Sequence, residues 1–269
     1  MNTPSLPARN MEHRAVGEEE YVRSVLKRYA VETGPDARPP KTARRLIPDL
    51  EAWAGDMLLP PGIRVTGAGA RAAAVRTDGD TDLMIPLRKD AGDIRSIYRS
   101  LWRLADERRW THWSRVVSRR VALDDVIIDL VPVLVDPDAD CPHTIYFVDR
   151  DATTQTNLDL HVQLAEKADC AEVVQLVKIW RDVQGLELPS LHLELLTYEA
   201  LDGDRTGTLV DRFRKVLRHI DGPRVLDPMP DPANPENVVS AGASREQKER
   251  AVDRARWSVN EAHLTEVLR

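Results

Sequence analysis

Cysteine is nearly absent from this chain, which has only Cys141 and Cys170. The two lie far apart in the sequence, and neither is part of a Cys-x-x-Cys pair. Zinc sites and disulfide frameworks need more cysteines at closer and more regular spacing. The sequence therefore gives no support to either, and predicts two buried free thiols.

Long hydrophobic runs are also missing. No apolar stretch approaches the length of a membrane span, and residues 1–20 lack the apolar core of a signal peptide. We therefore expect a cytoplasmic protein. The net charge is −6, so the surface as a whole is not that of a general polyanion binder.

The 269 residues are enough for one large domain or two small ones with a proper core. Hydrophobic periodicity predicts an α/β half followed by a helical half, with a boundary near residue 145. Residues 1–17 are expected to be a flexible leader. The expected helices are 18–33, 42–57, 91–110, 157–184, 190–201, 205–219 and a last helix from about 244, and the expected strands are 63–65, 80–85, 115–122 and 125–135.

The strongest chemical signal is the pair Asp80-x-Asp82 at the start of an apolar strand. Residues i and i+2 of a strand point to the same face, so both carboxylates are expected to project together. A third acid, Asp129, interrupts a run of valine and isoleucine, where a buried aspartate is costly unless it is paired or binds a cation. Three converging carboxylates suit magnesium. The alternative is that Asp80 and Asp82 only mark a turn.

A second signal is the glycine turn Gly67-Ala68-Gly69, which follows a short strand. Such a turn lets backbone N–H groups approach a phosphate, although a tight turn is the more common reason for two glycines.

The glycine turn and the aspartates together, in this order and spacing, resemble the Gly-Ser … Asp-x-Asp signature of the polymerase-β nucleotidyltransferases. The chain looks closest to the CD-NTase branch, the bacterial relatives of cyclic GMP-AMP synthase and oligoadenylate synthase. Asp129 resembles that family's third carboxylate. Further similar segments are Lys178-Ile179-Trp180, the helix start from Ser190 to Glu194, and a late loop that runs from Asp227-Pro228 to Asn237-Val238.

The resemblance implies an α/β (α+β) polymerase-β-type core with a mixed sheet, over residues 18–145, and a C-terminal helical lobe over 146–269. It places the active site in a cleft between them. Two Mg²⁺ or Mn²⁺ ions would be held by Asp80, Asp82 and Asp129, and the nucleoside triphosphate, such as ATP, by Gly67, Ala68, Lys178 and Ser190. For Lys178 the alternative is an ordinary surface lysine, and for Ser190 a helix N-cap.

The implied activity joins nucleoside triphosphates into a cyclic di- or oligonucleotide second messenger with release of pyrophosphate, in antiphage defence. Two alternatives stay open: transfer of a nucleotide to an RNA end, a protein or a small molecule, and a catalytically weakened nucleotide-binding regulator. The second gains weight from one departure, because Ala68 and Ala73 stand where the family usually carries serine and threonine. Each lost hydroxyl contact costs about 1 kcal/mol, which would slow an enzyme rather than abolish it.

A basic stretch follows the aspartate pair. Its arginines, interleaved with Trp102, Trp110 and Trp113, are Arg95, Arg99, Arg103, Arg108, Arg109, Arg115, Arg119 and Arg120. Such a stretch is compatible with a nucleic-acid surface. The simpler interpretation, favoured by the negative net charge, is an amphipathic helix whose arginine stems cover apolar surface.

Overall fold

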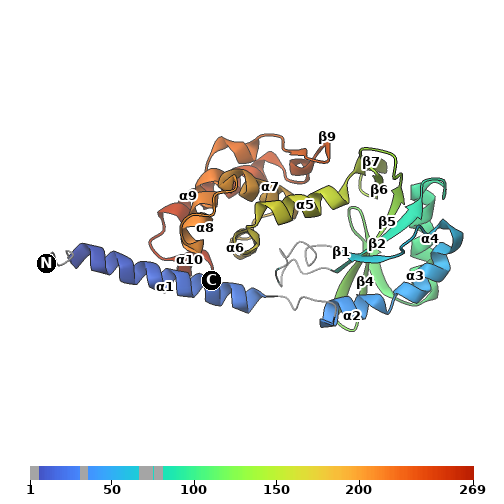
Figure 1. The fold of residues 1–269 in the computed structure, drawn as a ribbon, viewed down its shortest axis with the longest axis horizontal. Coiled ribbons are helices and arrows are strands. Elements are labelled where there is room, and N and C mark those ends of the chain that lie inside the picture. Colours follow the sequence, from blue (N-terminus) through green and yellow to red (C-terminus); the bar gives the residue numbers. More distant parts are fainter. Residues whose placement is uncertain (1–5, 31–35, 67–74, 76–80) are drawn as a thin grey trace.

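The structure is a computed structural model that describes residues 6–30, 36–66, 75 and 81–269. A mixed sheet with its covering helices forms one end of the molecule, and a group of helices forms the other (Figure 1). The expected α/β class with a mixed sheet and a helical half is confirmed. None of the helices in these ranges is long and apolar enough to cross a bilayer.

The elements follow one another as a sheet-rich half and then a helix-rich half. The helices are α1 (Leu6–Tyr29), α2 (Arg38–Arg44), α3 (Ile47–Ala54), α4 (Ile94–Glu107), α5 (Leu158–Ala168), α6 (Ala171–Val183), α7 (Ser190–Leu201), α8 (Leu209–Ile220), α9 (Arg245–Asn260) and α10 (Leu264–Val267). The strands are β1 (Arg64–Thr66), β2 (Thr81–Arg88), β3 (Thr111–Ser114), β4 (Arg119–Leu123), β5 (Val126–Val135), β6 (His143–Phe147), β7 (Ala152–Thr156), β8 (Pro230–Asp231) and β9 (Asn234–Val238).

The main sheet has the order β1-β2-β5-β4-β3, and β6 joins the far end of β5 and carries β7. Strands β2 and β5 are parallel, whereas the other pairs are antiparallel. A parallel pair needs a crossover, which α4 supplies. The nearly continuous apolar sequence of β5 fits its central place, where both faces are covered for much of its length.

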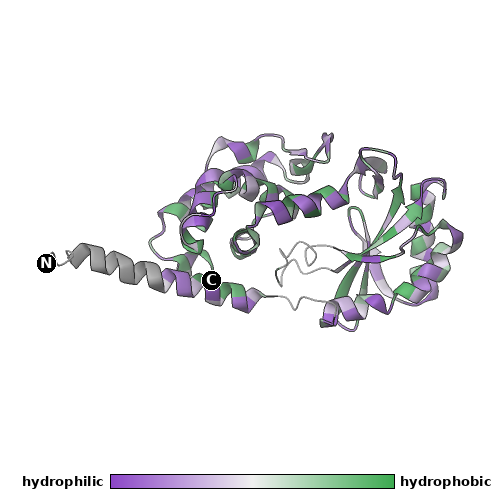
Figure 2. Cartoon of the chain, viewed as in Figure 1, coloured by the Kyte–Doolittle hydropathy of each residue, from purple (hydrophilic) through white to green (hydrophobic). Residues whose placement is uncertain are grey.

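One face of the sheet is covered by α2, α3 and α4. Leu83, Ile85 and Leu87 of β2 pack there in one apolar cluster, together with Ile128 and Leu130 of β5. Figure 2 shows hydrophobic segments, in green, on the strands of the sheet. Because side chains alternate along a strand, Asp82 and Asp129 point to the opposite face. In Figure 1, α3 and α4 lie on the side of the sheet away from the helical half, so the aspartate face is turned toward the helical half.

Two expected helices are divided in the structure. The helix expected over 42–57 is α2, α3 and a short 3-10 turn, Gly55–Met57. Pro48 in the first turn of α3 has no N–H to donate, so a continuous helix would lose a hydrogen bond there. The helix expected over 157–184 is broken between α5 and α6, where Asp169 has a left-handed φ of 46°.

The chain ends of the two halves also differ from the expectation. Helix α1 begins at Leu6 rather than at residue 18, so part of the expected leader is helical. The last helix ends at Asn260, and α10 is separate. The sheet continues through β7, past residue 145, and the run of helices begins at α5. The division of the chain into domains at residue 145 stays a prediction.

The helical half has its own apolar core, built on α6, α7 and α8. Trp180 of α6 is fully buried, and its Nε1 donates a hydrogen bond to Ser258 Oγ of α9 over 2.9 Å. Tyr21 of α1 donates to the Leu268 carbonyl over 2.7 Å, which joins the first helix to the last residues. The helices of this half are therefore fixed to one another around α6.

Candidate active site

Two of the predicted carboxylates lie side by side. Asp82 of β2 and Asp129 of β5 are register partners across the parallel pair. Neighbouring strands are about 4.8 Å apart, and partners in a ladder project to the same face. Asp129 is 8% exposed, and Asp82 is half-buried. The sheet thus presents two oxygen donor groups at one point of the face opposite α2, α3 and α4.

The aspartates belong to a row of side chains that runs across the sheet. Thr66 of β1 pairs with Asp82, and Arg120 of β4 pairs with Asp129. Trp113 of β3 pairs with Arg120 and continues the row to the edge. All these partners share the aspartate face of the sheet. Acidic, basic and aromatic groups are therefore aligned there, and Trp113 is 40% exposed.

Arg120 forms a bidentate ion pair with Asp129. Its Nε donates to Oδ1 over 2.9 Å, and its Nη2 donates to Oδ2 over 2.7 Å. Both side chains are nearly buried, at 13% and 11% exposed. Two parallel charge-assisted bonds are the strongest arrangement that an arginine and a carboxylate form. The negative charge of Asp129 is therefore already compensated within the protein.

The turn between β4 and β5 fixes this arrangement. Asp124 and Asp125 have φ angles of 48° and 62°. Two successive positive φ values are the mark of a type I′ hairpin turn. This two-residue turn sets Leu123 opposite Val126, and the same register sets Arg120 opposite Asp129.

The other predicted metal ligand and the glycine turn cannot be placed. Asp80, Gly67 and Ala68 all lie outside the described residues. Within the described ranges, no three His, Cys, Asp or Glu side chains form a metal-binding group. The two aspartates still fit a divalent cation. An ionised carboxylate has about four lone-pair sites, and Arg120 uses two of those on Asp129. Carboxylate oxygens are the donors that Mg²⁺ takes.

Lys178, a predicted phosphate ligand, is fully buried in the helical half. Its Nζ lies 2.8 Å from Glu194 Oε1 of α7, and Glu194 is only 1% exposed. The alternative of a surface lysine is therefore wrong. The ion pair gives Lys178 a structural partner, because a buried charge needs compensation. Its contact with a phosphate stays a prediction.

Ser190, the other predicted phosphate ligand, is the first residue of α7. The N-cap is Pro189, so the alternative of Ser190 as N-cap is wrong. Arg181 of α6 donates from Nη1 to Ser190 Oγ over 2.8 Å, and from the same atom to the Leu188 carbonyl over 3.3 Å. Arg181 is a cation beside Ser190 that the sequence analysis did not single out. Phosphate binding by Ser190 also stays a prediction.

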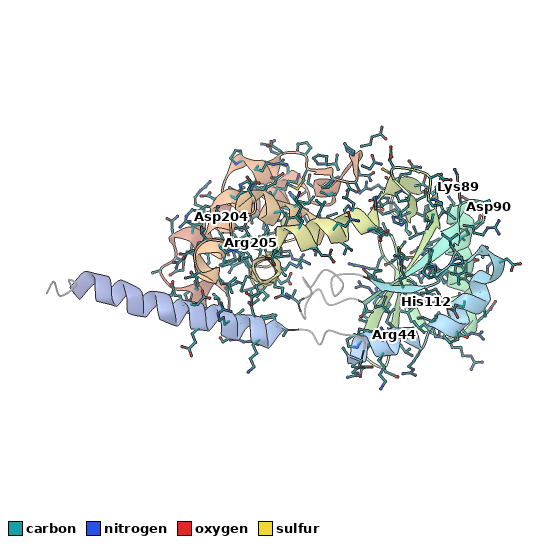
Figure 3. All side chains as sticks on the ribbon, viewed as in Figure 1. Arg44, Lys89, Asp90, His112, Asp204 and Arg205 are labelled. Atoms are coloured by element: carbon teal, nitrogen blue, oxygen red, sulfur yellow. The ribbon has the colours of Figure 1, made fainter. Side chains whose placement is uncertain are left out.

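Four arginines of the basic stretch, namely Arg95, Arg108, Arg119 and Arg120, contact other groups of the protein. Arg119 is fully buried, with its guanidinium carbon 3.5 Å from the centre of the Trp102 ring. Arg95 pairs with Asp151, and Arg108 with Asp49. His112, labelled in Figure 3, follows on β3 and contacts Asp106 over 3.0 Å. The stretch is not the single amphipathic helix of the simpler interpretation, because α4 ends at Glu107, and Arg119 and Arg120 lie on β4. A nucleic-acid surface here stays a prediction.

Comparison with known proteins gives a match at the level of structure only. No protein-family model and no curated protein matches the chain. E. coli CdnC, solved with ATP, has 18% identity and a TM-score of 0.73, covering 90% of this chain and 90% of that one. The CD-NTase CdnG of Bradyrhizobium diazoefficiens, in complex with GTP, has 14% identity and a TM-score of 0.66 over 90% of each chain.

A third solved structure is the CdnE cyclic dinucleotide synthase of Elizabethkingia meningoseptica with GTP and Apcpp. It has 15% identity and a TM-score of 0.65, and the match covers 89% of this chain and 97% of that one. The match thus extends over both the sheet and the helical half. The resemblance seen in the sequence is confirmed at the level of fold: this chain has the CD-NTase fold.

Proposed function

We propose that this protein is a metal-dependent nucleotidyltransferase that joins nucleoside triphosphates and releases pyrophosphate. The observation that carries the proposal is the pairing of Asp82 and Asp129 on neighbouring strands within a CD-NTase fold. Fold alone does not define an activity, so the proposal depends on the acidic pair that the sheet places on the face opposite α2, α3 and α4.

The solved structures of the same fold support the substrate class. CdnC was solved with ATP and CdnG with GTP, and CdnE is described as a cyclic dinucleotide synthase. By this likeness, the substrates of this chain are nucleoside triphosphates, and its product is a cyclic di- or oligonucleotide. A role as second messenger in cytoplasmic antiphage defence completes the proposal.

In the reaction, a ribose hydroxyl oxygen of one nucleotide attacks the α-phosphorus of another. The new P–O bond forms as the bond to the bridging oxygen breaks, pyrophosphate leaves with the electron pair, and the hydroxyl proton passes to solvent. Asp82 and Asp129, with Asp80, would hold Mg²⁺, which would make the hydroxyl more acidic and offset charge on the leaving group. Lys178 and Ser190 bind the triphosphate of the donor nucleotide.

Arg120 and Arg181 add two roles from the protein itself. Arg120 orients Asp129 through both oxygens, so the carboxylate has one defined position on the sheet. Arg181, whose Nε also pairs with Asp182 over 2.7 Å, places its guanidinium beside Ser190. Ala68 lacks the hydroxyl usual in the family, so we expect a modest rate rather than inactivity.

The test is to incubate purified protein with all four labelled nucleoside triphosphates and Mg²⁺ or Mn²⁺. Pyrophosphate is measured, and products are treated with phosphatase and analysed by mass. Pyrophosphate with phosphatase-resistant products supports the cyclic synthase. Pyrophosphate with phosphatase-sensitive or acceptor-linked products indicates linear transfer. Nucleotide binding without pyrophosphate under any condition indicates a regulator and contradicts the proposal.

A further inference from the structure

Arg120 creates an unusual electrostatic situation at the candidate active site. Asp82 and Asp129 are neighbours on one face of the sheet, where two carboxylates repel each other. The Arg120 guanidinium lies within 2.9 Å of both oxygens of Asp129. One positive charge is thus supplied by the fold where a divalent cation is proposed to bind.

We infer that Arg120 is a built-in counter-ion that competes with the divalent cation for Asp129. The inference rests on the proposed function, because that proposal makes Asp82 and Asp129 the cation ligands. In the metal-free protein, Arg120 compensates the acidic pair and keeps the site folded. Cation binding then has to weaken the Arg120–Asp129 ion pair.

Three features favour competition over orientation alone. The guanidinium engages both carboxylate oxygens, so every coordination site on Asp129 is next to a positive charge. An arginine keeps its charge at any ordinary pH and has no lone pair to offer a metal. The side chains of Arg120 and Asp129 are only 13% and 11% exposed. Solvent and salt therefore screen little of the repulsion between the Arg120 guanidinium and a dication.

The hairpin prevents Arg120 from simply moving away. Arg120 and Asp129 are register partners on β4 and β5, joined by a two-residue turn. Only the side chain of Arg120 can swing, so its charge stays close to the site in either state. The competition is therefore a permanent property of the fold, and it sets the cation concentration at which the site fills.

The experiment measures Mn²⁺ binding to the nucleotide-free protein by calorimetry, together with the melting temperature with and without Mn²⁺. We expect Arg120→Gln to bind Mn²⁺ about tenfold more tightly than wild type, because the variant removes a positive charge beside the ligating carboxylate. Without metal, Arg120→Gln should melt at a lower temperature than wild type. Saturating Mn²⁺ should raise the melting temperature of Arg120→Gln by more than it raises that of wild type.

Two further variants serve as controls. Arg224→Gln removes an equally bidentate ion pair, with Glu199 in the helical half, and should leave Mn²⁺ affinity unchanged. Arg120→Lys keeps the positive charge but cannot form the bidentate contact with Asp129. Its affinity for Mn²⁺ should therefore lie between those of wild type and Arg120→Gln. If Arg120→Gln does not fold, the lysine variant carries the test.

The outcomes separate the inference from the proposed function. Equal or weaker Mn²⁺ binding in the Arg120 variants overturns the inference and makes Arg120 a positioning residue only. Asp129→Asn tests the proposed function separately, because it should bind Mn²⁺ more weakly than wild type. If Asp129→Asn binds Mn²⁺ as wild type does, the cation site itself is wrongly assigned, whatever the Arg120 variants do.

Discussion

Asp82 and Asp129 are register partners on the one parallel strand pair described in the main sheet, so their carboxylates share a face and a level. This relationship links residues that are distant in the sequence. It depends on the connection through α4, β3 and β4, after which β5 lies parallel beside β2. The chemistry proposed for the protein follows from this juxtaposition, since each aspartate alone would be an ordinary buried or half-buried acid.

The buried ion pair between Lys178 and Glu194 leads to a stability prediction. Lys178→Met leaves the Glu194 carboxylate buried without its cation, so we expect a loss of about 3–5 kcal/mol in the free energy of unfolding. Lys178→Met/Glu194→Leu should recover most of this loss, because an apolar pair needs no compensation. Urea unfolding measures both. If the unfolding free energy of Lys178→Met were within about 1 kcal/mol of wild type, the Lys178–Glu194 ion pair would not be needed for stability.

The His192 side chain predicts a loss of stability in mild acid. It is fully buried on α7, and neither ring nitrogen has a hydrogen-bond partner among the described residues. Burial, aided by Lys248 and Arg224, lowers the pKa of His192 from 6.5 to about 4. Between pH 6.5 and pH 4, His192 binds a proton in the unfolded chain but stays neutral in the folded protein. Stability is therefore full above pH 6.5 and falls toward pH 4, by up to about 3 kcal/mol.

The variant His192→Leu isolates this contribution. It should flatten the fall in unfolding free energy between pH 6.5 and pH 4, whereas replacement of the exposed His263 by asparagine should leave the profile as in wild type. Unfolding by urea at several pH values is the measurement. An unchanged slope in His192→Leu would assign the acid sensitivity to other groups, such as His143, whose pKa burial also lowers.

The hydrogen bonds of Asp231 lead to a further prediction about the stability of the fold. It accepts hydrogen bonds from Thr156 Oγ1 over 3.0 Å and from the Ala233 N–H over 2.8 Å, and it lies 2.7 Å from His161 Nε2. It thereby joins β7, α5 and the β8–β9 hairpin. Asp231→Ala should lower the free energy of unfolding by about 2–4 kcal/mol, since buried donors lose their acceptor.

A matched control is available on the surface. Asp149 is half-exposed and contacts only its neighbour Arg150 in the described contacts, over 3.8 Å. Asp149→Ala should change the unfolding free energy by less than about 0.5 kcal/mol, as is usual for surface substitutions. Equal losses in the two variants, measured by thermal or urea unfolding, would mean that the Asp231 network adds no stability.

Part of the fold can be predicted from the sequence, because hydrophobic periodicity identifies most of the helices and the strands β1, β2, β4 and β5. The sequence does not predict the short strands β3, β6, β7, β8 and β9. The pairing of Arg120 with Asp129 can also be predicted from the sequence. The strands on either side of Asp124-Asp125 meet at a two-residue turn, and counting outward from it places Arg120 opposite Asp129. In the sequence, Arg120 stands out only as one arginine of a basic stretch, and its pairing with Asp129 follows only from the register of the hairpin.

Other features could not be read from the sequence. The burial of Lys178 depends on Glu194, which belongs to a different helix, and periodicity alone does not tell which side chains of two packed helices meet. The break between α5 and α6 rests on a left-handed Asp169, a conformation that a non-glycine residue rarely adopts. Roles for Asp80, Gly67 and Ala68 stay predictions, since these residues lie outside the described ranges.

The most direct test of the central claim is pyrophosphate release by wild type, Asp129→Asn and Asp125→Asn with nucleoside triphosphates and Mg²⁺. Asp125 lies in the same hairpin, and its side chain is 99% exposed, so it controls for the loss of a nearby charge. We predict release by wild type and by Asp125→Asn, and a loss of at least about 100-fold in Asp129→Asn. Release at the wild-type rate by Asp129→Asn would contradict the assignment of the carboxylate pair as the active site.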